Sequence, residues 1–514
     1  MLDGLLEGLR FGLGTALQPL NLMMVFVGCF AGTFIGMLPG LGPISAIALM
    51  IPITYGFDPS TGLILMAGVY YGAVFGGSTS AILINAPGIA GTVATSFDGY
   101  PLARQGMAGK ALAIAAYSSF SGGTIAAVFL LLAAPALATV ALSFQSADYF
   151  ALMVLGLTAV SAFAGQGQRL KAVMMVVLGL MLSTVGTDPT AGVQRFTFGS
   201  MNLFDGISFL LLAMATFALS EALMAVLRGE QLSNPSSKAG TLGNMGSLRL
   251  SRPEIRQIAP TIGRSSVLGF ILGVLPGSGA TIASFLAWGM ERNFVGRTER
   301  AKFGKGSLNG LAAPETANNA ASSGSFVPLL TLGIPGSGTT AVILGALISY
   351  GIEPGPQLFR DNPEVFWSVI VSMYIGNVIL LVMNLPLIPY IAKLLALPRQ
   401  VLVPLILFFS LIGVYLVSFN TFDIYMMVAF AALAIGLRLF GFPMAPLILA
   451  FILGDLMEDN LRRALALSDG SIAFLWERWL TLGILSVTVV LVFMPMIVGL
   501  LRQRRDSPRA GEGG

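Results

Sequence analysis

Two Pro-Gly motifs interrupt apolar segments in the first half of this chain, and both recur in the same order in the second half. Residues 36–43 match residues 273–279, and residues 87–92 match residues 335–340. Proline lacks a backbone N–H and glycine costs conformational entropy, so these motifs break helices. In lipid, broken backbone is tolerated only where it is buried in protein or lines a cavity. Interrupted hydrophobic segments at corresponding places in two halves are typical of the binding site of a secondary transporter.

The composition predicts an all-α polytopic membrane protein. Hydrophobic residues make up 55% of the chain and charged residues only 10%, whereas soluble domains carry about 25% charge. The net charge of +4 gives no sign of nucleic-acid binding, because the basic residues lie in short loops and in the C-terminal tail. The N-terminus has no basic segment before an apolar core, so we expect no cleaved signal peptide.

The residues that most enzymes depend on are missing. The chain has no histidine and one cysteine, Cys29, which excludes a disulfide framework, a thiolate metal site and a Ser-His triad. It also has no Walker A pattern. Ser-Lys catalysis stays open, although nothing singles out a lysine. We therefore expect neither an enzyme nor a bound cofactor.

The one long polar connection divides the chain between the two motif sets. We predict a first transmembrane repeat over residues 1–230, a linker over 231–253, and a second repeat with C-terminal helices and a basic tail over 254–514. The positive-inside rule places the linker, the basic segment 292–305 and the tail in the cytoplasm.

We expect a short helix to restart after each Pro-Gly break, near residues 43–54, 89–97, 280–291 and 338–350. A helix start presents unpaired N–H groups and the positive end of the helix dipole, which suit an anion. The alternative is that these motifs are only tight turns and packing glycines. The predicted substrate-binding residues are Pro39, Gly40, Gly42, Pro87, Gly88, Gly91, Thr92, Gly277, Ser278, Gly279, Pro335, Gly336, Ser337, Gly338, Thr339 and Thr340.

Polar side chains inside the apolar segments are candidates for binding a coupling cation. Hydroxyl, amide and carboxylate oxygens are suitable ligands for a small hard cation. The sodium candidates are Ser78, Thr79, Ser80, Asn85, Asn318 and Asn319, and Glu315 is a candidate for binding a proton or a cation. Two alternatives stay open: the hydroxyls make only interhelical hydrogen bonds, or Glu315 lies at an interfacial helix start.

A charged segment near residue 460 has a simpler interpretation. Glu458 and Arg462 are four residues apart and can pair on one helix face. We expect an interfacial helix whose charges fix its position.

The motifs together resemble the tripartite tricarboxylate transporter TctA family of large membrane subunits. The resemblance rests on residues 36–43, 76–80 with 85–88, 97–101, 313–320, 333–337 and 458–463, and it covers about residues 15 to 500. It implies inverted repeats with re-entrant hairpins and an elevator architecture like that of the ion-transporter superfamily. It also implies a multi-pass subunit of the bacterial inner membrane that works with a small TctB-like membrane subunit and a periplasmic TctC-like receptor.

The sequence therefore predicts the translocation subunit of a receptor-dependent importer of carboxylates such as citrate. Uptake is expected to follow a cation gradient, with Na⁺ favoured over H⁺ because the motifs contain no histidine and few carboxylates. The alternatives are an anion channel and a carboxylate carrier that needs no receptor.

Overall fold

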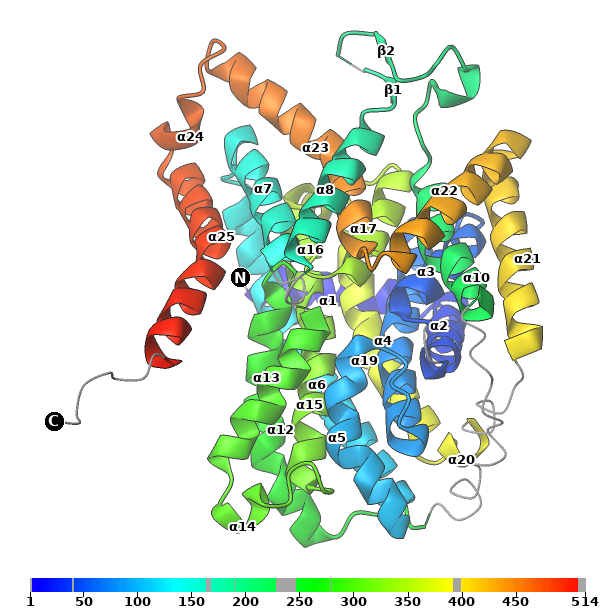
Figure 1. The fold of residues 1–514 in the computed structure, drawn as a ribbon, viewed down its shortest axis with the longest axis vertical. Helices are drawn as coiled ribbons and strands as arrows, with labels where there is room; N and C mark the ends of the chain where they lie inside the picture. Colours follow the sequence, from blue (N-terminus) through cyan, green and yellow to red (C-terminus); the bar gives the residue numbers. More distant parts are fainter. Residues whose placement is uncertain are drawn as a thin grey trace, which may run out of the picture.

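The fold is built almost entirely from helices (Figure 1). The computed structural model describes residues 2–38, 41–162, 168–188, 190–227, 246–277, 279–391 and 399–506. The first half contains α1 (Leu2–Ala16), α2 (Pro19–Met37), α3 (Pro43–Thr54), α4 (Pro59–Ile84), η1 (Ala90–Thr92), α5 (Val93–Leu102), η2 (Ala103–Met107), α6 (Ala108–Ala141), α7 (Ser146–Ala162), α8 (Arg169–Ser183), β1 (Gly186–Thr187), β2 (Gln194–Arg195), η3 (Met201–Leu203), α9 (Phe209–Ala213), η4 (Met214–Leu219) and α10 (Ser220–Leu227). The second half contains α12 (Arg252–Val274), α13 (Gly279–Phe294), α14 (Arg297–Arg300), α15 (Leu308–Gly324), α16 (Phe326–Leu332), α17 (Gly338–Ser349), α18 (Pro356–Asp361), α19 (Pro363–Asn384), α20 (Ile388–Ile391), α21 (Arg399–Ser418), α22 (Thr421–Leu439), α23 (Ala445–Leu467), α24 (Phe474–Glu477) and α25 (Trp479–Asp506).

The prediction of a helical membrane protein is confirmed. In the described ranges, five helical segments are long and apolar enough to cross a bilayer: Pro19–Met37, Pro59–Ile84, Ala90–Leu137, Pro363–Asn384 and Thr421–Leu439. Strands β1 and β2 form a small antiparallel hairpin at one end of the molecule, and α14 lies at the opposite end (Figure 1). Most of the predicted linker, residues 231–245, lies outside the described residues.

The start of α12 is fixed after this linker by local polar contacts. Ser251 and Glu254 form a capping box, which satisfies amide groups at the helix start. Lys110 of α6 pairs with Glu254 at 2.5 Å, and this hydrogen bond holds the pKa of Glu254 at about 2. The second half therefore begins at a helix end that is tied to the first half.

Both halves repeat one order of elements. In the first half α2, a break and α3 precede α4, a second break and the pair η1–α5. In the second half α12, a break and α13 precede α15–α16, a second break and α17. The predicted short helices are thus confirmed, with α3, α5, α13 and α17 after the four breaks. Equivalent helices also make equivalent contacts, because α2 packs on α4 as α12 packs on α15, and the two halves interlock through α6 on α15 and α19 on α4.

Glycines let the paired helices approach until their backbones touch. A Cβ added at Gly32 would lie 2.2 Å from the carbonyl oxygen of Val69, and one at Gly72 would lie 2.4 Å from that of Cys29. In the second half, a Cβ added at Gly273 of α12 would lie 2.3 Å from the carbonyl oxygen of Ala321. Small residues at four-residue spacing permit such close packing in lipid. The two helix pairs therefore have no room for side chains at these positions.

We predict that Gly32→Leu lowers the melting temperature of the detergent-solubilised protein by several degrees. A leucine side chain must push α2 from α4, and overpacking costs about 1–3 kcal/mol. The matched control is Gly263→Leu in α12, where an added Cβ meets nothing within 4 Å. Equal melting temperatures for Gly32→Leu and Gly263→Leu would show that the close approach of α2 and α4 is not required.

Candidate functional site

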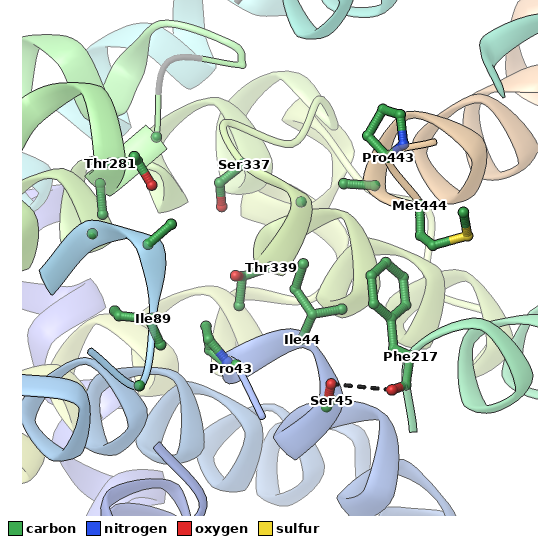
Figure 2. Close-up of a pocket in the computed structure, with 18 of the residues that line it drawn as sticks. Pro43, Ile44, Ser45, Ile89, Phe217, Thr281, Ser337, Thr339, Pro443 and Met444 are labelled. Carbon is green, nitrogen blue, oxygen red and sulfur yellow. Dashed lines mark hydrogen bonds between the residues drawn. The ribbon is translucent and has the colours of Figure 1, made fainter. Parts of the chain in front are cut away.

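The four helix breaks meet around one cavity of about 770 Å³ (Figure 2). The first half contributes Gly42, Pro43, Pro87, Gly88 and Gly91 to its wall, and the second half contributes Gly277, Gly279, Ser337, Gly338 and Thr339. Matching motifs of the two halves lie more than 230 positions apart in the sequence. The structure thus brings both copies of both motifs to a single site.

The breaks pack on one another through backbone atoms. A Cβ at Gly88 would lie 1.7 Å from the carbonyl oxygen of Gly36, and one at Gly336 would lie 2.8 Å from that of Gly273. The Gly277 N–H donates to the carbonyl of Gly336 at 3.1 Å. Gly277 has φ +79°, a left-handed conformation that a side chain would strain. The interrupted backbone therefore satisfies part of its hydrogen bonding within the protein.

Helix starts face the cavity. Ser337 caps α17, where its hydroxyl accepts from the Thr340 N–H at 3.2 Å and the Thr340 hydroxyl accepts from the Ser337 N–H at 2.9 Å. The Ser337 hydroxyl also lies 3.4 Å from the hydroxyl of Tyr70 on α4. Pro43 occupies the first turn of α3 after Gly42, as the sequence predicts. The positive ends of the α3 and α17 dipoles therefore lie at this wall.

Some predicted residues do not reach the cavity wall. Thr92 donates to the carbonyls of Gly77 at 3.2 Å and Ile89 at 3.0 Å. The Thr340 hydroxyl is part of the capping box of α17. Pro335 and Gly336 precede Ser337 in the same break and are not among the residues that line the cavity. The predicted residues Pro39, Gly40 and Ser278 lie outside the described residues.

A charged pair on the cavity wall was not predicted. Arg438, near the end of α22, and Glu221, at the start of α10, both line the cavity. Their side chains approach to 3.7 Å. The repeated Pro-Gly motifs contain no basic residue, so they gave no indication of Arg438. An arginine within an apolar segment is by itself a candidate functional residue. Arg438 meets this description.

Glu315 lies behind the cavity wall at the centre of a cluster of hydroxyls. It is fully buried in the interior of α15, so the alternative of an interfacial helix start is wrong. Ser78 of α4 donates to both carboxylate oxygens at 2.9 and 2.7 Å, and Ser119 of α6 donates at 2.9 Å. Thr95 of α5 donates as well. Four helices from both halves therefore meet at one carboxylate.

The other cation candidates fall into two groups. Asn319 donates to the side chain of Asn318 at 2.7 Å and to the carbonyl of Glu315 at 3.0 Å, and Asn318 donates to the Gly91 carbonyl at 3.4 Å. These two amides therefore adjoin Glu315. Thr79 and Ser80 donate to carbonyls of their own helix, and Asn85 ends α4 as an exposed residue with φ 53°. Within the described ranges, no group of three or more Asp, Glu or Cys side chains is placed to hold a metal ion.

Two further sets of charged residues anchor the structure elsewhere. Asp98 accepts from the N–H groups of Gly304, Gly306 and Ser307 and from the Trp288 indole, so it holds the loop before α15. The predicted pair of Glu458 and Arg462 is confirmed at 2.6 Å.

Both members of that pair lie on a separate cavity of about 490 Å³, beside the β1–β2 hairpin. Arg462 also pairs with Asp188 at 2.7 Å, and Glu458 pairs with Arg195 at 2.8 Å. Partial desolvation opposes ionisation of Asp188, but hydrogen bonds from the Thr190 amide and from Arg462 outweigh it and lower its pKa. The network ties α23 to the hairpin.

Comparison with known proteins decides the family. Residues 22–449 match the tripartite tricarboxylate transporter TctA family. The chain belongs to this family. It is also 44% identical over 507 residues, 99% of both chains, to an uncharacterized 52.8 kDa protein in the TAR-I ttuC' 3' region of Agrobacterium vitis. An uncharacterized protein in the TAR-II ttuC' 3' region of that organism is 42% identical over 239 residues, which cover 46% of this chain and 98% of the relative. No solved structure matched the chain.

Family membership confirms the resemblance seen in the motifs and has three consequences. The protein is a multi-pass membrane protein. It is a subunit of a tricarboxylate transporter, and the tripartite name indicates that such transporters have further components. The family is one of transporters, in agreement with the expectation that the chain is not an enzyme.

We predict that Ser337→Asp abolishes carboxylate uptake although the protein still folds. A carboxylate at a helix start favours the helix by about 0.3–1 kcal/mol. It would repel an anion at about 4 Å by roughly 4 kcal/mol at an effective dielectric constant of 20, which is nearly a thousandfold in affinity. Ile89→Asp, at the matching position of the first copy, is expected to behave in the same way. The measurement is uptake of radiolabelled citrate by membranes with equal amounts of each variant.

Glu458→Gln is the control for both substitutions, because Glu458 lies on the separate cavity beside the hairpin. We expect it to retain most of the uptake. Wild-type uptake by both aspartate variants would mean that the substrate does not bind at these helix starts.

Proposed function

We propose that this chain is the translocation subunit of a secondary importer that couples carboxylate uptake to a cation gradient, with sodium as the ion. The observation that carries the proposal is the convergence of four broken helices on one cavity of about 770 Å³. Discontinuous helices whose starts face an anion and whose carbonyls face a cation are the usual construction of such sites. A binding cavity at the contact between the two halves favours a carrier over a channel, which needs a continuous pore.

The substrate is proposed to be a carboxylate such as citrate. The family name and the positive ends of the helices support this class. The hydroxyls of Ser337, Thr339 and Thr281 line the same wall and can donate hydrogen bonds to carboxylate oxygens. Backbone amides at the breaks supply further donors, and glycine allows a ligand to approach them.

The coupling cation is proposed to bind at Glu315. Its carboxylate and the hydroxyls of Ser78, Thr95 and Ser119 bring at least four oxygen atoms together. A hydroxyl has two acceptor lone pairs besides its proton, so these groups can turn from the carboxylate to a cation. Oxygen ligands of this kind suit a small hard cation. Sodium is favoured over a proton because no histidine is available to form a relay.

The Glu315 cluster adjoins the substrate cavity through one segment. Gly91 lines the cavity, and its carbonyl accepts from Asn318, whose neighbour Asn319 contacts the backbone of Glu315. Thr95, one helical turn further on, donates to Glu315. A change at the cation site therefore reaches the cavity wall through η1 and the start of α5, which provides a route for coupling.

The proposed assembly follows the tripartite organisation of the family. We propose that the chain lies in the bacterial inner membrane and receives substrate from a periplasmic TctC-like receptor, beside a small TctB-like membrane subunit. The basic residues of α14 and of the start of α12 lie at the end opposite the β1–β2 hairpin (Figure 1). The positive-inside rule assigns that end to the cytoplasm, so the hairpin end would face the receptor. We also propose an elevator motion of two inverted repeats.

The experiment that tests this proposal is citrate uptake by proteoliposomes that contain the three components. We expect uptake to saturate, to require an inward sodium gradient, and to be lost in Glu315→Gln, because a neutral amide cannot balance the charge of the cation. Glu458→Gln is the matched control and should keep most of the uptake. Uptake by the wild-type protein that persists without sodium and follows a proton gradient would contradict sodium coupling and identify Glu315 as a proton site.

A further inference from the structure

Arg438 and Glu221 give the substrate cavity a second polar wall, which the Pro-Gly motifs do not explain. Among the described residues that line the cavity, Arg438 is the one cation and Glu221 is the one anion. Their side chains are 21% and 24% exposed, so both border the cavity. Figure 2 shows the neighbouring Ser45 and Phe217 on the side of the cavity away from Thr281 and Ser337.

The guanidinium of Arg438 is held in place by several contacts. One terminal nitrogen donates to the Thr216 carbonyl at 2.9 Å, and the guanidinium carbon lies 5.9 Å from the centre of the Phe217 ring. Both partners belong to the π-helical segment η4, and π-helical turns occur frequently at functional sites. These contacts orient the planar group, which is the form in which arginine recognises carboxylates through paired hydrogen bonds.

Glu221 is placed to act as the partner of Arg438 when no substrate is bound. The shortest distance between the two side chains is 3.7 Å, longer than the 2.7–2.9 Å of a charge-assisted hydrogen bond. The other carboxylate oxygen of Glu221 accepts a hydrogen bond from Ser45 of α3. A second carboxylate can therefore approach Arg438 more closely than Glu221 does, while Ser45 continues to hold Glu221.

We propose that Arg438 binds one carboxylate of a substrate whose other carboxylate binds at the helix starts, so that the site selects compounds with two or more carboxylates. The inference rests on the proposed function, because it identifies the residue that binds a second carboxylate of the substrate in the same cavity. A monocarboxylate occupies the helix starts alone and gains nothing from Arg438. Glu221 is the counter-ion that the second carboxylate replaces.

The test is the ligand-induced rise in melting temperature of the purified chain, titrated with citrate and, separately, with acetate to obtain affinities. We expect Arg438→Gln to weaken citrate binding about tenfold to a hundredfold, the range for a hydrogen bond to a charged group, and to leave acetate binding unchanged. Arg438→Lys keeps the charge without the planar fork and should recover part of the loss. Glu221→Gln removes a like charge from the wall and should strengthen citrate binding.

Arg195→Gln is the matched control, because Arg195 forms an ion pair of similar exposure with Glu458, outside this cavity. We expect it to bind both ligands as the wild type does. If Arg438→Gln binds citrate like the wild type, or weakens citrate and acetate equally, the inference is wrong and the proposed function is unaffected. If the wild-type chain binds neither ligand, the proposed carboxylate site itself is overturned.

Discussion

The structure depends on how four interruptions of helical backbone are buried inside a membrane protein. Each break exposes N–H and carbonyl groups that lipid cannot satisfy. The breaks meet this demand by packing on each other, with Gly88 against Gly36, Gly336 against Gly273, and the Gly277 N–H bound to the Gly336 carbonyl. They can do so only because glycine lets the helices α2 and α4, and likewise α12 and α15, approach to backbone contact. Close helix packing and the binding cavity are therefore two results of one constraint.

The same arrangement places a buried carboxylate next to the cavity. Glu315 receives hydroxyl donors from helices α4, α5 and α6, and it belongs to α15 itself. Burying a charge without such partners is costly. The positions of these four helices and the ionisation and cation binding of Glu315 therefore depend on each other. In the proposed mechanism, a cation that binds here favours one arrangement of the helices, and the segment from Gly91 to Thr95 transmits this preference to the cavity wall.

The sequence predicted the features that follow from local chemistry. Pro-Gly breaks in apolar segments identified the short helices that follow them, and the helix expected near residues 43–54 begins at Pro43 in the structure. The spacing of Glu458 and Arg462 predicted their ion pair. Such features depend on neighbours in the chain, so the sequence contains the information that they need.

Contacts between distant segments could not be predicted in this way. Arg438 reaches the cavity only because α22 packs beside η4, and nothing in the local sequence around Arg438 indicates that packing. Asn85 follows a candidate stretch of polar residues, yet it ends α4 at an exposed position with φ 53°, whereas Ser78 within the helix contacts Glu315. Ser119 was overlooked because its partner lies 196 positions away.

Cysteine protection can show whether the cavity between the helix breaks binds the carboxylate substrate. Cys29 is the one cysteine of the chain and is buried, so Cys29→Ser provides a background for a single new cysteine. Thr339→Cys places it on the cavity wall, and Thr187→Cys places a control on the exposed face of the β1–β2 hairpin. We expect citrate to slow the reaction of a water-soluble thiol reagent with Thr339→Cys and to leave the reaction with Thr187→Cys unchanged. Equal rates at Thr339→Cys with and without citrate, in a protein that still transports citrate, would contradict substrate binding in this cavity.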